Sequence, residues 1–421
     1  MSDKISNGVY PRVVVTGVGT VSPIGNNASD FWHSLITGKS GVDKIKAFDP
    51  SRFGCQIAAE VKHYDPKASI PLKESRRMEQ FSQFAVTAAK EAFKDSGIDM
   101  NKENPFEVGV VVGSGMGSLR IIEETHSVYL AKGPDKFSPF MIPLLIINMA
   151  AGWISILLGL KGPNLAVVTA CASGTHAIGE AYRMIQHGQA KVMIAGGTES
   201  CITPLGIGGF CALKALSKRN DDPKSASRPF DKERDGFVMG EGAGLVVLEE
   251  LEHAKARKAH LYGELAGYGL NGDAYHMTAP RPDGEGAAYC MKQAINDARM
   301  RPEDITYINA HGTSTELNDK VETLAIKTLF KDYAKKVQIS STKSMTGHTL
   351  GAAGGIEFVV CCLSLKHQTL HPTINQTHPD PECDLDYIPN TARKTSVEAC
   401  LSNSLGFGGH NASILVKRFR G

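Results

Sequence analysis

The chain has 421 residues with a formal net charge of +2, and 42% of its residues are hydrophobic. This length predicts two domains or one duplicated domain rather than a single simple core. The near-neutral charge, without an arginine-rich run or zinc-finger spacing, argues against a nucleic-acid-binding protein, and nine scattered cysteines without a CxxC pair are typical of a reducing compartment.

The N-terminal stretch MSDKISNGVYPR contains no apolar signal region and no long Arg/Ser-rich transit peptide. We therefore expect a cytoplasmic protein. The bacterial cytosol is the first expectation, and an organelle stroma or matrix is the alternative if a transit peptide has been removed.

Hydrophobic periodicity predicts alternating strands and helices along the whole chain. In the first part we expect strands over 12–15, 108–112, 165–168, 191–195 and 245–248, and helices over 30–37, 76–96 and 250–258. In the second part we expect strands over 261–268, 305–309, 337–340, 399–403 and 413–416, and helices over 286–299 and 350–366. This alternation predicts an α/β fold with mostly parallel sheets covered by helices.

One stretch, residues 141–160, carries no charge over twenty residues and is long enough to raise the question of a membrane span. Pro143, Asn148 and Trp153 interrupt it, and no second such stretch accompanies it. We interpret it as a buried helix, with a subunit interface as one location for it, and expect no membrane span.

A weak internal repeat relates the two parts. VGVVVGSGMGS (108–118) corresponds to ITYINAHGTST (305–315), and LAVVTACASGTHAIG (165–179) corresponds to VQISSTKSMTGHTLGAAGG (337–355). A repeat on this scale predicts two similar halves, which we place at residues 1–258 and 259–421.

Cys171 stands where a predicted buried strand passes through small residues into a helix. A helix N-terminus carries partial positive charge, which favours the thiolate and places such cysteines at pKa values of roughly 3.5–7.5. A buried, inert cysteine is the alternative. The local pattern therefore predicts a nucleophile without proving one.

Five chemically useful residues follow the carboxyl ends of predicted strands, where ligands gather in α/β sheets. They are Cys171, His311, Lys343, His348 and Phe407. A cysteine with histidines is a nucleophile set for acyl transfer, and backbone N–H groups at Cys171 and in the Phe407 turn are candidates for an oxyanion hole. Each histidine alone is better explained as a structural residue.

Other motifs are weak. The glycine turns at Gly17 and Gly113 do not complete GxGxxG, and no GxSxG motif surrounds Cys171. The histidines lack metal-ligand spacing, so no metal site is predicted, and Cys361 and Cys362 are expected in a helix core.

Five longer motifs carry a resemblance to a known family. TACASGTHAIG, DKERDGFVMGEGAG (231–244), NAHGTSTELND, SSTKSMTGHTLGAAGG and GFGGHN resemble the β-ketoacyl-acyl-carrier-protein synthases, in the order Cys, His, His. The resemblance runs from about Arg12 to the C-terminus and is closest to the type II elongating synthases. It implies a thiolase-like αβαβα five-layer fold made of two similar halves, and a homodimer.

The resemblance also implies a reaction. Cys171 would accept an acyl chain as a thioester, and His311 and His348, supported by Lys343, would hold the malonyl thioester carbonyl while CO₂ leaves. The carbanion would attack the Cys171 thioester and lengthen the chain by two carbons. The partner would be acyl carrier protein, whose phosphopantetheine arm carries the substrates, and no separate cofactor is expected.

Further roles follow from the same resemblance. Thr313 and Thr315 would contact pantetheine, and Phe407 would gate access to Cys171. Met116 lies where the type II synthases usually carry Ile in the acyl pocket, and Leu405 lies where Phe is common, which leaves chain length open.

Two groups of charged residues have open interpretations. Lys73, Arg76, Arg77 and Lys214 would form a basic patch for the carrier, or else belong to solvated helix faces. Asp319 and Glu322 would support the site, with exposed helix charges as the alternative.

Three other functions remain in view. A polyketide-type ketosynthase would differ in acyl chain and partners. A non-catalytic chain-length partner subunit would lack the active cysteine, which this chain has. A lipid-binding protein without chemistry is the third.

Overall fold

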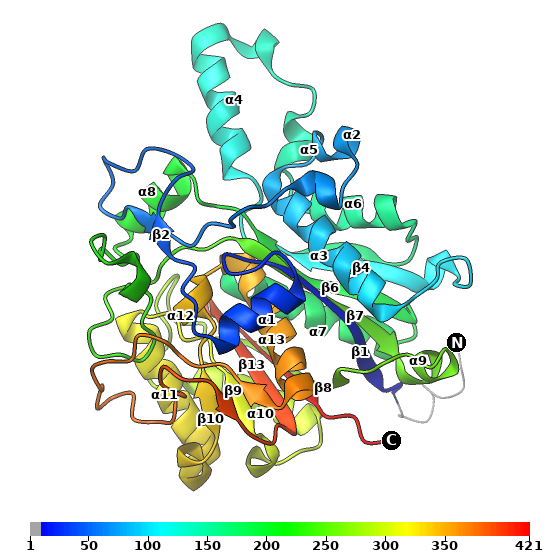
Figure 1. The fold of residues 1–421 in the computed structure, drawn as a ribbon, viewed down its shortest axis with the longest axis vertical. Helices are drawn as coiled ribbons and strands as arrows, with labels where there is room; N and C mark the ends of the chain where they lie inside the picture. Colours follow the sequence, from blue (N-terminus) through cyan, green and yellow to red (C-terminus); the bar gives the residue numbers. More distant parts are fainter. Residues whose placement is uncertain (1–9) are drawn as a thin grey trace.

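The computed structural model describes residues 10–421 of the chain (Figure 1). Residues 1–9 lie outside the described residues. They make up most of the N-terminal stretch in which we expect no targeting segment. The main sheet has ten strands in the order β10-β9-β13-β14-β8-β1-β7-β6-β4-β5. The strands are β1 (Val13–Val21), β4 (Val108–Gly113), β5 (Asn164–Val167), β6 (Val192–Glu199), β7 (Gly242–Glu250), β8 (Gly263–Gly272), β9 (Tyr307–Asn309), β10 (Gln338–Ser340), β13 (Ala399–Gly406) and β14 (His410–Lys417).

The strand order repeats the same plan on either side of the β1–β8 pair, as the internal repeat predicts. Strands β4 and β9 each lie between two parallel neighbours, while β7 and β14 each lie between two antiparallel ones. The sheet is therefore mixed, and the expectation of mostly parallel pairing was wrong. The reason lies in short connections such as the one from β13 to β14, because tight turns can join only antiparallel strands.

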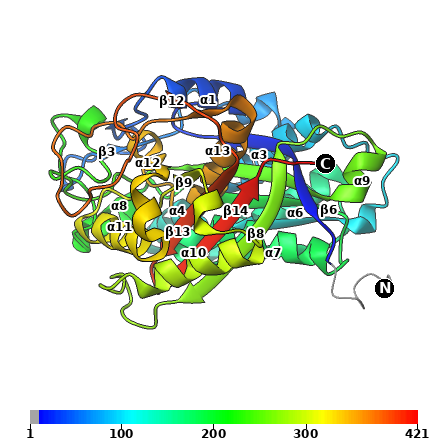
Figure 2. The ribbon, with the colours of Figure 1, turned by 90° about the horizontal axis from the view of Figure 1, so that it is seen from below.

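Helices form three layers around the strands. Helices α7 (Ser173–Gln186) and α13 (Ala353–His367) contact strands of both halves and each other, so they form the central layer. Helix α3 (Gln80–Ser96) covers the outer face of the first half, and α10 (Glu285–Asp297) covers that of the second. Figure 2 shows β13 and β14 between α13 and α10. The predicted five-layer αβαβα arrangement is confirmed, while the division at residue 258 stays a prediction.

Glycines allow the central layer to form. A Cβ added to Gly174 of α7 would stand 2.8 Å from the Gly355 nitrogen of α13, and one at Gly355 would stand 2.2 Å from the Gly244 oxygen. The small residues of TACASGTHAIG and TLGAAGG therefore serve close helix packing as well as chemistry. Leu350–His367 is also apolar enough to cross a membrane, but it is the buried core helix of this layer.

The remaining elements frame the site or the surface. They are α1 (Ala28–Ile36), α2 (Leu72–Ser75), α8 (Pro204–Ala212), α9 (Leu251–Ala256), α11 (Glu316–Phe330), α12 (Lys343–Thr346), the small sheets β2 (Asp43–Lys44) with β3 (Ile57–Ala58) and β11 (Thr369–Leu370) with β12 (Arg393–Lys394), and 3₁₀ turns of which η5 (Ala170–Ala172) and η9 (Leu350–Ala352) border the site. Helices α8 and α11 were missed by the sequence analysis.

Two predicted elements of the first half differ from the structure. The apolar stretch 141–160 is not one buried helix but α5 (Met141–Leu145) and α6 (Met149–Leu158), because the chain is extended at Ile146. The strand at 165–168 is not buried: β5 is the sheet edge, and Leu165 and Val168 are 47% and 54% exposed.

A helical excursion precedes α5 and was not predicted. Helix α4 (Leu119–Lys132) extends away from the body of the molecule (Figure 1), and none of its residues is buried. Phe137, Phe140 and Ile142 in the following segment are also exposed. The excursion and the edge strand each leave large apolar side chains exposed on the first half.

Candidate active site

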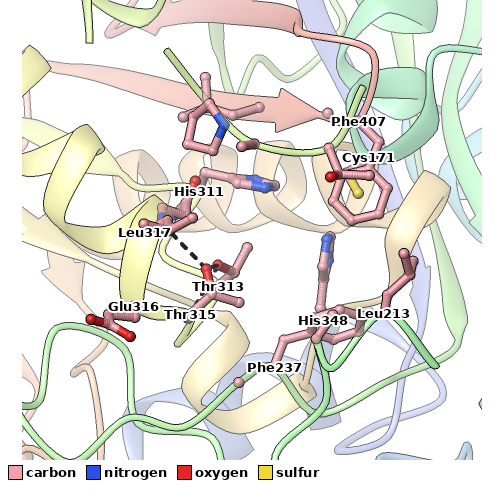
Figure 3. Close-up of a pocket in the computed structure, with 18 of the residues that line it drawn as sticks. Cys171, Leu213, Phe237, His311, Thr313, Thr315, Glu316, Leu317, His348 and Phe407 are labelled. Carbon is pink, nitrogen blue, oxygen red and sulfur yellow. Dashed lines mark hydrogen bonds between the residues drawn. The ribbon is translucent and has the colours of Figure 1, made fainter. Parts of the chain in front are cut away.

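A cavity of about 380 Å³ opens between the two halves and receives side chains from both (Figure 3). Its lining includes Cys171 from the first half and His311, His348 and Phe407 from the second. Four of the five residues predicted to share a crevice therefore line one cavity. The fifth, Lys343, lies behind the histidines.

Cys171 occupies η5, directly before α7, as the strand–turn–helix pattern predicts. Its side chain is 8% exposed, and the backbone N–H groups of Phe407 and of Cys171 itself lie near enough to the sulfur to lower its pKa. Burial nevertheless raises the pKa of the Cys171 thiol to about 12, opposed by the charge of Lys343. The predicted shift toward thiolate was therefore wrong for this site, because desolvation raises the pKa more than Lys343 and the two backbone N–H groups lower it.

His311 follows β9, and its position is set by a buried carboxylate. The backbone N–H groups of His311 and Gly312 each donate to Glu322 of α11 at 2.8 Å. Burial, with help from Lys343 and His348, lowers the pKa of His311 well below its ordinary value. The ring is therefore a neutral imidazole at neutral pH.

His348 lies in the loop between α12 and η9. The backbone N–H of Leu350 donates to His348 Nδ1 at 3.3 Å, so the proton of the neutral ring belongs on Nε2. Burial and Lys343 lower the pKa of His348 well below its ordinary value. The two imidazoles face the same cavity with ring centroids 5.3 Å apart and planes at 88° (Figure 3).

Lys343 is buried, and its Nζ lies 3.4 Å from His311 Nδ1. It also forms an ion pair with Glu357 of α13. Burial raises the pKa of Glu357 to about 7, opposed by Lys343. Lys343 therefore places a positive charge behind the histidines, and the sequence analysis missed its partner Glu357, which lies fourteen residues farther along the chain.

Phe407 stands in the turn between β13 and β14, beside Cys171 (Figure 3). The turn is held by the loop after β8: Gly408 N–H donates to Met277 O at 2.8 Å, and Asp273 N–H donates to Gly409 O at 2.9 Å. The Phe407 ring also lies 6.2 Å from the ring of Phe210. Phe407 thus forms an aromatic wall of the cavity on a glycine-rich turn, and its gating role stays a prediction.

Thr313 and Thr315 face the cavity with their hydroxyls 2.8 Å apart (Figure 3). Arg234, which is buried, donates to the carbonyl oxygens of Thr315 and Glu316, each at 3.1 Å. Arg234 belongs to the quoted motif DKERDGF, which was the only signal that could have pointed to it.

The open cavity does not include Met116. That residue packs in the apolar cluster that contains Cys171 and Leu350, and its N–H faces buried Glu199 at 3.3 Å. Leu405 does line the cavity. Met116 therefore packs in the apolar cluster of Cys171 without lining the open cavity, and its place in the acyl pocket stays a prediction.

Asp319 and Glu322 are both fully buried, so the alternative of exposed helix charges was wrong. Asp319 accepts the N–H of Phe230 at 2.8 Å and lies 3.8 Å from Arg234. Both carboxylates hold backbone around the cavity.

The four basic residues considered for a patch do not form one group. Lys214, after α8, is exposed and lines the cavity. Lys73, Arg76 and Arg77 are exposed on α2 and the turn after it, which lies apart from α8 (Figure 1). Between residues 10 and 421, no three His, Cys, Asp or Glu side chains are grouped so as to hold a metal ion.

Comparisons with known proteins agree with this geometry. Residues 11–254 match the model of the β-ketoacyl synthase N-terminal domain, and residues 262–377 match that of the C-terminal domain. The chain is 54% identical to 3-oxoacyl-[acyl-carrier-protein] synthase 2 of Coxiella burnetii and 51% identical to that of Synechocystis sp., each over 97% of this chain and 98% of the relative.

A solved structure of a type II polyketide ketosynthase, in complex with its acyl-carrier protein and bound to the hexaketide, is also similar. Its TM-score is 0.91 at 37% identity, covering 98% of this chain and 100% of that one. With matches to both domains and near-complete coverage by relatives above half identity, the chain belongs to the β-ketoacyl synthase family.

Proposed function

We propose that the protein is an elongating 3-oxoacyl-[acyl-carrier-protein] synthase, which condenses malonyl-carrier with an acyl chain held on Cys171 and releases CO₂. The observation that carries this proposal is the convergence of one thiol and two neutral imidazoles on a single cavity. The names of relatives at 51–54% identity support the same reaction.

In the first half-reaction, Cys171 Sγ attacks the thioester carbon of an acyl-carrier. The N–H groups of Cys171 and Phe407, which face the sulfur, are placed to stabilise the oxyanion that forms on the acyl oxygen. The carbon–sulfur bond to pantetheine breaks, and the departing sulfur takes the proton that the Cys171 thiol gives up. This proton transfer agrees with a Cys171 side chain that is a neutral thiol before the reaction.

In the second half-reaction, His311 and His348 donate hydrogen bonds to the malonyl thioester oxygen. Lys343 at His311 Nδ1 and the Leu350 N–H at His348 Nδ1 place the ring protons on Nε2. As CO₂ leaves, its bonding electrons form an enolate on that oxygen, which the two donors stabilise. The enolate carbon attacks the Cys171 thioester, and the carbon–sulfur bond breaks. The departing Cys171 thiolate takes a proton from solvent and returns to the thiol.

Acyl carrier protein is the proposed partner. The exposed Lys214 at the cavity, and Thr313 and Thr315 along it, supply a positive charge and hydroxyls for an acidic carrier and its phosphopantetheine arm. The similar ketosynthase solved with its carrier supports this assignment. We propose that no separate cofactor takes part and that the reaction takes place in the cytosol.

A homodimer accounts for the exposed surface of the first half. Among residues 10–421, strand β5 pairs only with β4, and its other edge is flanked by the exposed side chains of Leu165, Val168 and Ile156. An unprotected apolar edge strand in a single chain invites strand pairing. Pairing of two β5 edges in a homodimer would cover it.

Two variants of Cys171 test the mechanism. Cys171→Ala should form no acyl-enzyme and no condensation product by intact-mass analysis, while Cys171→Gln should still release CO₂ from malonyl-carrier. Cys211→Ala, which removes a half-buried thiol from α8, is the matched control and should behave as wild type. Normal condensation by Cys171→Ala would refute the proposal, and loss of CO₂ release in Cys171→Gln would refute the division between thiol and histidines.

A further inference from the structure

The turn that carries Cys171 has an unfavourable backbone conformation. Ala170 has φ +50°, in the left-handed region that residues with a Cβ rarely adopt. Such a conformation persists only where surrounding contacts hold it, and such positions cluster at functional sites. The contacts that hold this turn therefore bear on where the Cys171 sulfur lies.

Two side chains of α7 close the turn. Ser173 Oγ accepts the N–H of Thr169 at 2.9 Å and donates to the carbonyl oxygen of Ala170 at 2.7 Å, so it bridges both sides of the strained residue. His176 Nδ1 lies 2.8 Å from Thr169 Oγ1, one helical turn farther on. Ser173 is fully buried and His176 is 7% exposed.

The surroundings of His176 keep its ring neutral. Burial, with a smaller contribution from His410 of β14, lowers the pKa of His176 to about 4. The ring of Tyr268 from β8 packs edge-on at 6.3 Å. The ring is therefore neutral at neutral pH, and Nδ1 can hydrogen-bond to the Thr169 hydroxyl without a change in protonation.

The second half contains the same backbone device. Leu350, directly before α13 in the corresponding η9, has φ +51°. There the closing side chain is His348, whose Nδ1 accepts the Leu350 N–H. The strained turn carries the Cys171 thiol in one half and holds the His348 imidazole in the other. A residue with positive φ therefore stands beside a reactive group on both sides of the cavity.

We propose that Ser173 and His176 are positioning residues that hold the Cys171 sulfur against the N–H groups of Cys171 and Phe407. This inference rests on the proposed function, in which Cys171 carries the acyl chain. Without the two bridges, Ala170 relaxes toward a favourable φ and the sulfur moves away from its two donors. The acylation half-reaction then slows, while decarboxylation, which depends on His311 and His348, does not.

The test compares Ser173→Ala and His176→Phe with wild type in both half-reactions. We expect acyl-enzyme formation on Cys171, measured by rapid quench and intact mass, to slow by about 10- to 100-fold. Misplacement of a reacting atom by about 1 Å has effects of this size. Release of CO₂ from malonyl-carrier without an acyl donor should stay within about twofold of wild type, as expected for groups that only position the nucleophile.

Ser96→Ala is the matched control. Ser96 Oγ likewise bridges a carbonyl, of Phe93 at 2.7 Å, and an N–H, of Ile98 at 3.3 Å, but at the far end of α3. It should lower the melting temperature as Ser173→Ala does and leave acylation unchanged. Wild-type acylation rates in both site variants, or equal losses in the two half-reactions, would overturn the positioning role. Failure of wild type itself to form an acyl-enzyme would instead refute the proposed function.

Discussion

At the scale of single residues, the site depends on one buried positive charge. Lys343 lowers the pKa of both His311 and His348 and lies at His311 Nδ1. Its positive charge also compensates the carboxylate of Glu357, which is buried beside it. Burial is the larger cause that lowers the pKa of both rings, and Lys343 adds to it without lining the cavity itself.

Replacing Lys343 by Met tests this. The pKa values of both histidines should rise, so the acid limb of the decarboxylation profile should move to higher pH. A His348 ring protonated on Nδ1 could no longer accept the Leu350 N–H. The charged ring would also form an ion pair with the malonyl carboxylate, which has to leave as CO₂. Loss of the charge should also cut the neutral-pH rate about 100-fold. The rate of CO₂ release against pH measures both effects.

A second variant separates this effect from damage to the fold. In Lys343→Met/Glu357→Gln no buried carboxylate is left unpaired, so stability should recover while the acid limb stays shifted. An acid limb at the wild-type position in both variants would contradict the role given to Lys343.

At the scale of elements, the close packing of α13 against strand β7 limits what the central layer tolerates. Gly355→Ala would place a Cβ 2.2 Å from Gly244 O, so we expect a loss of roughly 3 kcal/mol or more in the free energy of unfolding. Gly209→Ala in α8, with no atom within 4 Å of the added Cβ, should be neutral or stabilising by up to about 1 kcal/mol. Denaturant unfolding measures both, and equal stabilities would contradict the packing argument.

Helix α9 is attached by a histidine between two carboxylates. His253 Nδ1 lies 2.6 Å from Glu249 and its Nε2 lies 3.0 Å from Glu103, and the hydrogen bond to Glu249 is the main cause that raises the pKa of His253. The folded pKa exceeds the unfolded value of about 6.5, so this stabilisation is complete below that pH. It is lost as the pH rises through the folded pKa.

His253→Gln should remove this part of the pH dependence. The melting temperature of wild type should fall relative to that of the variant as the pH rises from about 6 toward 9. If the melting temperatures of wild type and variant change in parallel across that range, His253 does not contribute to the pH dependence of stability.

At the scale of the whole molecule, the first half ends in an exposed edge strand, β5, where we propose that two chains pair. Leu165→Lys at the free edge of β5 should convert the proposed dimer to monomer, measured by analytical ultracentrifugation. Leu324→Lys, at a similarly exposed position on α11, is the control and should leave the assembly unchanged. A wild-type monomer, or a dimer that survives Leu165→Lys, would contradict the proposed interface.

The fold and the site were predictable from the sequence to different depths. Motif order and the internal repeat were enough for the family, the paired halves and the chemical groups at the strand ends, because these depend on residue type and local spacing. Periodicity placed most strands within a few residues. It failed at 141–160, where apolar composition does not distinguish one buried helix from two half-exposed ones.

The sequence by itself determined which reactive groups are present and in which order. Only the tertiary structure decided their surroundings: that Cys171 rests as a thiol, that Lys343 stands behind His311 beside Glu357, and that β5 is an edge. Burial and electrostatic neighbours come from segments far apart in the chain, and no local pattern records them.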